Sequence, residues 1–256
     1  MRFWLRLGFS VLAIFTLLDR SASALGSVRG EAGIPLAVLT VLACLLAERW
    51  LWNQPVSSAS HALGLGMPTA KALAVAGGVG ALLLAFLPLF AAIARADATF
   101  YPRWPLLLPG LFCQGGIAEE VLFRGYLFGT LRSRYPFRRA AMLSTGPFLL
   151  AHLLLFLTME WPIALAATAL SLIVSFPLAH LFELGRRTMW APALLHFSIQ
   201  SPIKIVEMSG PAAAIYPLVW MGACAVIPWL VFLARIRGAD AVDIAPVGVS
   251  HERVTY

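Results

Sequence analysis

Long apolar runs, separated by short polar segments, dominate the chain. A helix needs about 20 mostly apolar residues to cross the hydrocarbon core of a bilayer. Eight runs approach or exceed this length, although the first and the seventh are short. The predicted helices cover residues 3–19, 33–52, 71–94, 105–131, 139–159, 162–183, 190–204 and 212–235. The pattern therefore predicts an all-α, polytopic transmembrane bundle of about eight helices.

Turn-forming residues divide the apolar runs, and no internal repeat or separate soluble domain is visible. We expect a single transmembrane domain over residues 1–237 and a polar cytoplasmic tail over residues 238–256. The N-terminus also resembles a secretory signal, with a basic start and the small residues Ala22–Ala24. Because Asp19 and Arg20 separate its apolar run from that candidate cleavage site, we expect the first helix to be retained.

Composition agrees with a membrane protein. The chain is 60% hydrophobic and 12% charged, whereas soluble domains are about 45–50% apolar and about 25% charged. Its formal charge of +7 does not form a nucleic-acid-binding stripe, because the basic residues lie in short loops between apolar runs. We expect the lipid bilayer, and not a nucleic acid, as a partner.

The basic loops also predict the orientation of the chain, because Lys and Arg are enriched in cytoplasmic loops. With both termini in the cytoplasm, thirteen basic residues lie on the cytoplasmic side and five on the other. The loop 132–139, RSRYPFRR, is the most basic. We therefore expect a multi-pass protein of a bacterial inner membrane, with eight crossings and both termini inside.

Two kinds of nucleophilic chemistry receive no support from the sequence. The cysteines are isolated in apolar runs, and we interpret all three as buried free thiols: Cys44, Cys113 and Cys224. The serines within the predicted helices lack a Gly-x-Ser-x-Gly setting, and such residues commonly bond the helix backbone. These serines are Ser144, Ser171, Ser175 and Ser198.

Three charged residues interrupt the fourth predicted helix: Glu119, Glu120 and Arg124. A charge at the centre of a membrane helix costs roughly 2.5 to 3.5 kcal/mol on insertion scales, and such residues usually mark a functional site. Glu120 and Arg124 are four residues apart and can pair on one helix face. Glu119 is rotated by about 100° from Glu120. We expect Glu119 to be a general base or metal ligand, with Glu120 and Arg124 structural; alternatively, both acids pair with Arg124.

Two histidines are predicted at a similar depth to Glu119. Counted from the nearest basic loop, Glu119 and His152 each lie thirteen residues into their helices, and His196 lies nine. At a rise of 1.5 Å per residue, these positions are about 20, 20 and 14 Å deep. Phe148 precedes His152 by one turn and is expected to pack against its imidazole. His180 lies closer to a basic loop, and we interpret it as structural.

These residue types support two ways to activate water. A carboxylate and an imidazole on adjacent helices can bind and deprotonate a water molecule. His196 and Gln200 share one helix face, and together they can donate hydrogen bonds to an oxyanion. Alternatively, Glu119, His152 and His196 could hold Zn²⁺ or another divalent metal, because His₂Glu is a known catalytic ligand set. The sequence does not choose between these mechanisms.

Three segments carry a resemblance to a known family. Residues 119–127, EEVLFRGYL, resemble the EExxxR signature of the CAAX protease and bacteriocin-processing (CPBP, or Abi) intramembrane proteases. Residues 148–152, FLLAH, are similar to its FxxxH motif, and residues 189–196, MWAPALLH, to its third motif. Their order and spacing also fit, and the resemblance covers about residues 105–200, which would form the catalytic core.

The resemblance implies an intramembrane endopeptidase that cleaves near a membrane-associated segment of a protein or peptide. It implies that Glu119 activates water with His152, and that His196 and residue 200 support the oxyanion. One position departs from the family pattern, since residue 200 is Gln instead of Asn or Asp. The longer side chain places its carboxamide differently, which puts the catalytic role of Gln200 in doubt.

Two other functions stay open, as does the substrate. A proton-coupled transporter could use the same acid and histidines as a relay, although such carriers often contain internal repeats. A non-catalytic immunity or scaffold protein with a relic site is the third reading, and Gln200 keeps it open. A prenylated CaaX tail, a leader peptide or a C-terminal sorting tail would each suit the protease.

Overall fold

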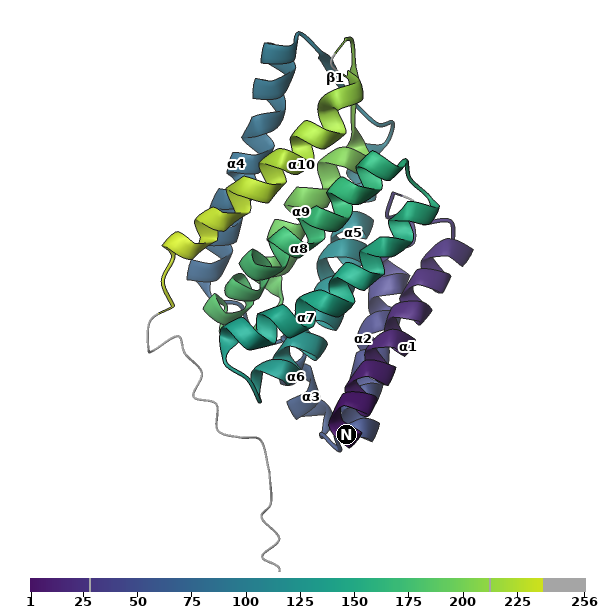
Figure 1. Ribbon diagram of the computed structural model, residues 1–256, viewed down its shortest axis with the longest axis vertical. Helices are drawn as coiled ribbons and strands as arrows, with labels where there is room; N and C mark the ends of the chain where they lie inside the picture. Colours follow the sequence, from purple (N-terminus) through teal and green to yellow (C-terminus); the bar gives the residue numbers. More distant parts are fainter. Residues whose placement is uncertain (28, 212, 237–256) are drawn as a thin grey trace, which may run out of the picture.

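The computed structural model describes residues 1–27, 29–211 and 213–236, and this part of the chain is a bundle of helices (Figure 1). The predicted all-α class is confirmed. The expected tail, residues 238–256, lies outside the described residues. The first half contains α1 (Arg2–Ala24), α2 (Gly33–Leu51), α3 (Val56–Ala62), α4 (Ala70–Ala94), β1 (Asp97–Phe100), α5 (Trp104–Leu111), η1 (Phe112–Ala118), η2 (Val121–Phe128) and α6 (Gly129–Arg132).

The second half continues with helices that alternate in direction. It contains α7 (Phe137–His152), η3 (Leu153–Leu157), α8 (Trp161–Leu184), α9 (Trp190–Ile205), β2 (Val206–Ser209), η4 (Ala213–Ile215), α10 (Tyr216–Val226) and η5 (Ile227–Leu233). The sequence pattern did not predict the short helix α3. It also missed the antiparallel ribbon of β1 and β2, in which Phe100 pairs with Val206.

The number of spans corrects the sequence-based expectation. Among the described residues, seven helices are long and apolar enough to cross a membrane, instead of eight. The difference is α9, which has 16 residues and a length of only about 24 Å. It packs against α4, α8 and η1, and ten of its residues are buried. An interior helix of this kind is surrounded mainly by other helices and not by lipid. It can therefore be short and can carry polar residues.

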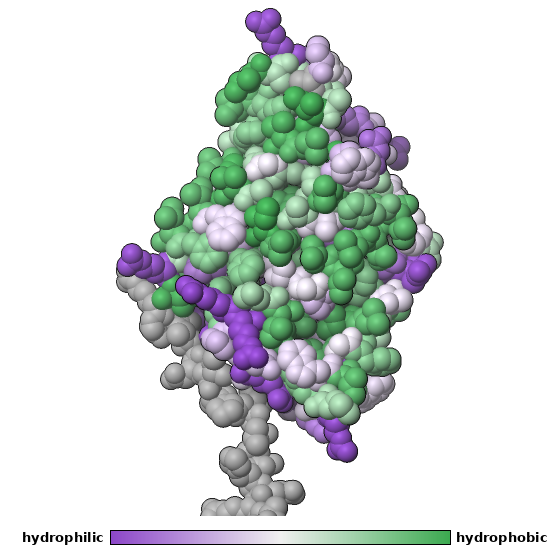
Figure 2. Space-filling model, viewed as in Figure 1, coloured by the Kyte–Doolittle hydropathy of each residue, from purple (hydrophilic) through white to green (hydrophobic). Residues whose placement is uncertain are grey.

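Lipid-facing surface covers the outside of the bundle. Large apolar side chains are exposed on several helices, among them Phe9, Leu42, Leu82 and Leu106. Apolar residues cover most of the visible face, while hydrophilic residues lie around its margin, at the top, along the right edge and most densely at the lower left (Figure 2). This distribution agrees with a multi-pass integral membrane protein, in which the bilayer solvates the exposed apolar side chains.

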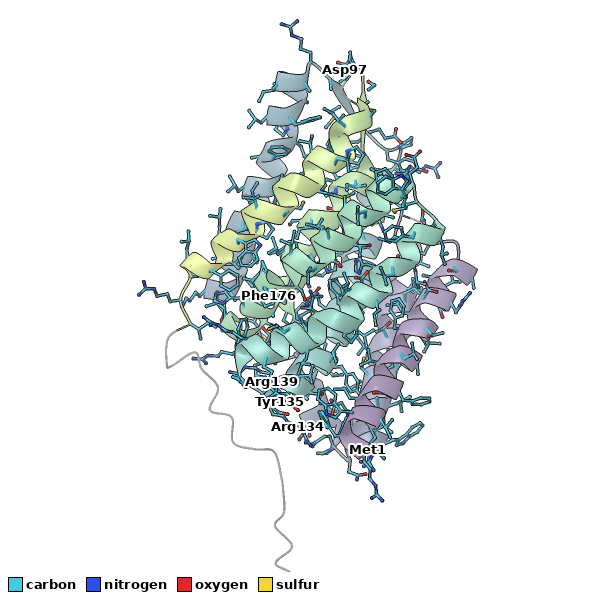
Figure 3. The ribbon with its side chains drawn as sticks, viewed as in Figure 1. Met1, Asp97, Arg134, Tyr135, Arg139 and Phe176 are labelled. Carbon is cyan, nitrogen blue, oxygen red and sulfur yellow. The ribbon has the colours of Figure 1, made fainter. Side chains whose placement is uncertain are left out.

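The two ends of the bundle differ in charge. One end, here called the basic end, holds Met1, Arg134 and Arg139, whereas Asp97 lies at the opposite end (Figure 3). Helix termini and loops place eleven described basic residues at the basic end: Arg2, Arg6, Arg49, Lys71, Arg132, Arg134, Arg138, Arg139, Arg186, Arg187 and Arg235. The opposite end holds Arg20, Arg29, Arg95, Arg103 and Lys204, balanced by Asp19, Glu31, Asp97, Glu160 and Glu207. Arg237 and Arg253 lie outside the described residues.

The helix expected at 105–131 is not a regular α-helix. Its α-helical ends, α5 and α6, enclose two π-helical segments, η1 and η2, with Glu119 and Glu120 between them. A π-helix closes its hydrogen bonds over five residues instead of four, and such turns are frequent at functional sites. The rise of 1.5 Å and the rotation of 100° that we assumed for residues 112–128 therefore do not apply there.

Glycines allow backbones to approach the helix that holds the glutamates. A Cβ on Gly33 would lie 1.8 Å from the carbonyl oxygen of Gly110, so α2 and α5 meet at two glycines. A Cβ on Gly115 would lie 1.5 Å from Nε2 of Gln200, and one on Gly116 would lie 3.1 Å from the Ala193 oxygen. Small residues let membrane helices pack closely, and here they bring α9 against η1.

Candidate active site

A buried ion pair lies at the centre of the candidate site. The Arg124 guanidinium Nη1 lies 3.0 Å from Oε1 of Glu120, and the two residues are 2% and 0% exposed. This pairing confirms the predicted contact across four residues. The guanidinium also lies 4.3 Å from the centre of the Phe148 ring, which packs the pair on its other side. Such burial is tolerable because each charge compensates the other.

His196 joins this pair, which the sequence did not predict. Its Nδ1 lies 2.6 Å from Oε1 of Glu120, the same oxygen that Arg124 contacts. Because an ionised carboxylate only accepts hydrogen bonds, Nδ1 of His196 is the donor. The other nitrogen, Nε2, lies 3.8 Å from Oε2 of Glu119. The imidazole is therefore held between two carboxylates, with Nε2 directed toward Glu119.

Glu119 differs from Glu120 in exposure. Its side chain is 27% exposed, whereas that of Glu120 is fully buried. Glu119 lies in a cavity of about 290 Å³ together with His152. The walls come from α1, η1, the start of η2, the end of α7 and η3, and Thr158 completes them. The two adjacent acids thus occupy different environments, one beside open space and one in the core.

The imidazole of His152 has one defined orientation. Its Nδ1 lies 2.9 Å from the carbonyl oxygen of Phe148. A carbonyl oxygen is an acceptor only, so Nδ1 carries the proton and donates it to this bond. The lone pair of Nε2 can then accept a hydrogen bond. The Phe148 ring packs edge-on against the imidazole with centroids 4.6 Å apart, as expected. Thr168 on α8 donates to the carbonyl oxygen of His152 at 3.2 Å, which fixes the end of α7.

Gln200 is placed differently from the other candidates. Its Nε2 donates to the carbonyl oxygen of Leu111 at 3.3 Å, and its amide packs on Gly115. Neither Gln200 nor His196 is among the residues that line the cavity with Glu119. The amide thus connects α9 to the junction of α5 and η1.

The geometry does not form a metal-binding cluster. Within the part of the chain that the structure describes, no group of three His, Cys, Asp or Glu residues is arranged to hold a metal ion. The hydrogen bonds of the two histidines do not decide the question, because they engage only Nδ1 of His196 and Nδ1 of His152. A histidine that binds a metal through Nε2 usually forms such a bond with its other nitrogen.

Sequence reasoning missed three polar residues of the cavity. Asp19 on α1, Gln114 on η1 and Thr158 after η3 all line it. Ser27 donates to Oε1 of Gln114 at 2.8 Å, which ties the loop after α1 to the site. Gln114 does have a sequence signal, because it is a lone amide in an apolar run beside two glycines.

The histidine and the cysteines that the sequence placed outside the active site are mostly as expected. His180 bonds the carbonyl oxygen of Ala234 at 2.9 Å, as a structural histidine would. All three cysteines are free thiols; Cys44 and Cys224 are buried, but Cys113 is only half-buried. Cys113 lies on η1, beside the cavity-lining Gln114, where packing is looser than the sequence suggested.

Comparison with known families covers the segment that contains this site. Residues 101–201 match the family model of the Type II CAAX prenyl endopeptidase Rce1-like family. This segment of the chain is similar to that family, and the match confirms the resemblance carried by the three motifs. At the level of the family, it supports a CAAX-type membrane protease, hence a peptidase. No curated protein and no solved structure matches the chain.

Loss of Arg124 tests the buried pair. We expect Arg124→Leu to reduce the free energy of unfolding by about 3 to 5 kcal/mol, because it leaves the buried Glu120 carboxylate without compensation. Adding Glu120→Gln to this variant should recover part of the loss, since the uncompensated charge is then absent. Unfolding of the purified protein in detergent measures both. Equal stability of the single and double variants would contradict a charge-compensating role.

Proposed function

We propose that this Rce1-like chain is an intramembrane endopeptidase that cleaves a peptide bond near a membrane-associated segment of its substrate. One observation carries the proposal: the partly exposed Glu119 carboxylate shares a cavity with His152 and faces an imidazole that the core holds in place. A carboxylate beside an ordered imidazole is suited to deprotonate water. The family match supports the same class of reaction.

Glu119 acts as the general base in the proposed reaction. It accepts a proton from a water molecule, whose oxygen attacks the carbonyl carbon of the scissile peptide bond. The carbonyl oxygen becomes an oxyanion in the tetrahedral intermediate. When the intermediate collapses, the C–N bond breaks and Glu119 returns the proton to the leaving nitrogen. His152 accepts a hydrogen bond at Nε2 and helps to orient the water, because its Nδ1 proton is committed to Phe148.

His196 stabilises the oxyanion in this scheme. Glu120 bonds Nδ1 and so directs Nε2 toward Glu119 and the reacting atoms. In this scheme an N–H at Nε2 donates to the oxyanion, which requires an imidazole that carries a proton on both nitrogens. Arg124 pairs with Glu120 and is a positioning residue, as is Phe148, which packs on the guanidinium. Gln200 holds η1 in place through Leu111, and we propose a positioning role for it as well.

An apolar groove supports a membrane-anchored substrate. The groove has a volume of about 540 Å³ and lies between α1, η2 and α7. It shares five wall residues with the Glu119 cavity: Phe15, Asp19, Phe123, Ala151 and Leu154. Because the two spaces are adjacent, an apolar segment in the groove would bring a neighbouring peptide bond close to Glu119.

Glu119→Gln tests the role of the base. The amide keeps the shape of the side chain but cannot accept the proton, so we expect cleavage to fall by roughly 10²- to 10⁴-fold with unchanged thermal stability. Quantitative proteomics of termini identifies proteins that stay unprocessed in cells with this variant. The matched control is Asp97→Asn, which changes an exposed acid on β1. Normal processing with Glu119→Gln would refute the proposal.

Metal content tests the alternative activation of water. If Zn²⁺ or another divalent ion is the activator, Glu119, His152 and His196 would supply its ligands after rearrangement. We expect the purified wild-type protein to contain no stoichiometric metal and to keep its activity after treatment with a chelator. Stoichiometric metal that is lost in His152→Ala would instead support the metal mechanism.

Narrowing the groove tests substrate binding. Gly8 lines the groove, and a Cβ there would meet nothing within 4 Å, so Gly8→Leu can fill space without a clash. We expect a several-fold higher KM for the membrane-anchored substrate and little change for a short peptide that spans the cleavage site. Gly78→Leu on α4 is the control, because Gly78 is also uncrowded and lies outside the groove. Equal effects of both variants would contradict binding in the groove.

A further inference from the structure

The Glu119 cavity lies toward the end of the bundle opposite the basic end. Its walls include Asp19 and Ala22 in the last turns of α1. They also include Leu155 and Thr158, which follow α7 and precede α8. Thr158 is exposed, so the wall reaches the surface at that end of the bundle. In Figure 1, these segments lie away from the N-terminus and the start of α7.

Packing closes the route from the site to the basic end. Every residue of η2 is buried, and η2 is the segment that leads from Glu119 toward the basic end. Its aromatic side chains pack across to neighbouring helices, with Phe123 against Phe148 and Phe128 against Phe182. Tyr126 bonds Ser10 on α1 at 2.7 Å. Apart from the apolar groove beside α1, which offers few polar wall residues to water, water or peptide would have to displace this packing in order to reach Glu119 from the basic end.

The difference in charge between the two ends indicates which end faces the cytoplasm. Eleven described basic residues lie at the basic end, whereas five lie at the opposite end with as many acids. Lys and Arg in short loops mark the cytoplasmic side. The basic end therefore faces the cytoplasm, and the mouth of the cavity faces away from it.

We infer that the candidate site opens to the extracytoplasmic face of the membrane, and that its substrates are exported proteins anchored in the bilayer by an apolar segment. The substrate class rests on the proposed peptidase function, whereas the direction of the opening does not. Cleavage then occurs near the outer end of the substrate's anchor, after the polypeptide has been translocated.

The apolar groove agrees with this substrate class. Its wall on α1 extends from Trp4, near the basic end, to Asp19 and Arg20, near the opposite end. The polar residues therefore lie where the groove meets the cavity, and apolar residues line the rest. An anchor in this groove would lie at bilayer depth, with its outer end beside Glu119.

Labelling of single cysteines tests the direction of the opening without an assay of activity. In full-length Cys113→Ala protein, Thr158→Cys places a thiol at the cavity mouth, and Ser58→Cys places a matched, exposed thiol on α3 at the basic end. The remaining cysteines, Cys44 and Cys224, are 0% exposed and serve as the labelling background. A membrane-impermeant maleimide is applied to intact cells, from which any outer membrane has been removed, and to permeabilised cells.

We expect Thr158→Cys to react fully in intact cells and Ser58→Cys to react only after permeabilisation. The reverse pattern would overturn the inference, as would labelling of both positions from the same side. Modified Thr158→Cys protein should also lose processing of its substrate when the reagent is applied from outside. Retained processing at full modification would show that the mouth is not the route to the site.

The proteins that stay unprocessed with Glu119→Gln provide the second measurement. We expect their uncleaved ends to be accessible to protease from outside the cell. Uncleaved ends that face the cytoplasm would refute the substrate class and leave the peptidase function intact. If no protein differs between wild-type and variant cells, the peptidase function fails, while the labelling result on the opening still stands.

Discussion

The arrangement of the site depends on the compensation of one buried charge. Glu120 is completely enclosed, and a carboxylate in such a position is strongly unfavourable without a partner. Arg124 supplies the opposite charge, and the same oxygen of Glu120 then holds the imidazole of His196. One interaction thereby links the helix with the two acids to α9. It also separates the roles of two adjacent glutamates, because the enclosed one organises the site and the accessible one is available for chemistry.

Backbone packing makes this arrangement possible. The imidazole on α9 can reach Glu120 only because η1 presents Gly115 and Gly116 to α9. The π-helical turns on either side of the acids also change the direction of successive side chains relative to a regular helix. The close approach of α9 and the π-helical turns thus occur in the same segment, residues 112–128. This segment is also where polar side chains meet inside an apolar bundle.

Much of the fold was predictable from the sequence, because long apolar runs in a bilayer have few alternatives to helices. The pair Glu120–Arg124 was also predictable, since it depends only on local spacing. The contact between Glu120 and His196 was not, because spacing along one helix says nothing about the rotation of another. The span count failed at α9 for a related reason: an interior helix can be short and polar when other helices, and not lipid, surround it. The π-helical segments left no periodic signal that an apolar pattern could reveal.

The short ribbon of β1 and β2 has a mechanical consequence. β1 precedes the helix that carries Glu119, and β2 follows directly after α9. Next to the ribbon, the backbone N–H of Tyr101 donates to the carbonyl oxygen of Ile205 at 2.8 Å. The two halves of the site are thus clamped together outside the apolar layer, and they cannot move apart without breaking strand hydrogen bonds. We expect the site to widen for a polypeptide at the flank formed by α1 and α7. Among the described residues this flank has no strand pairing, and single hydrogen bonds such as Ser10–Tyr126 and Thr168–His152 hold it.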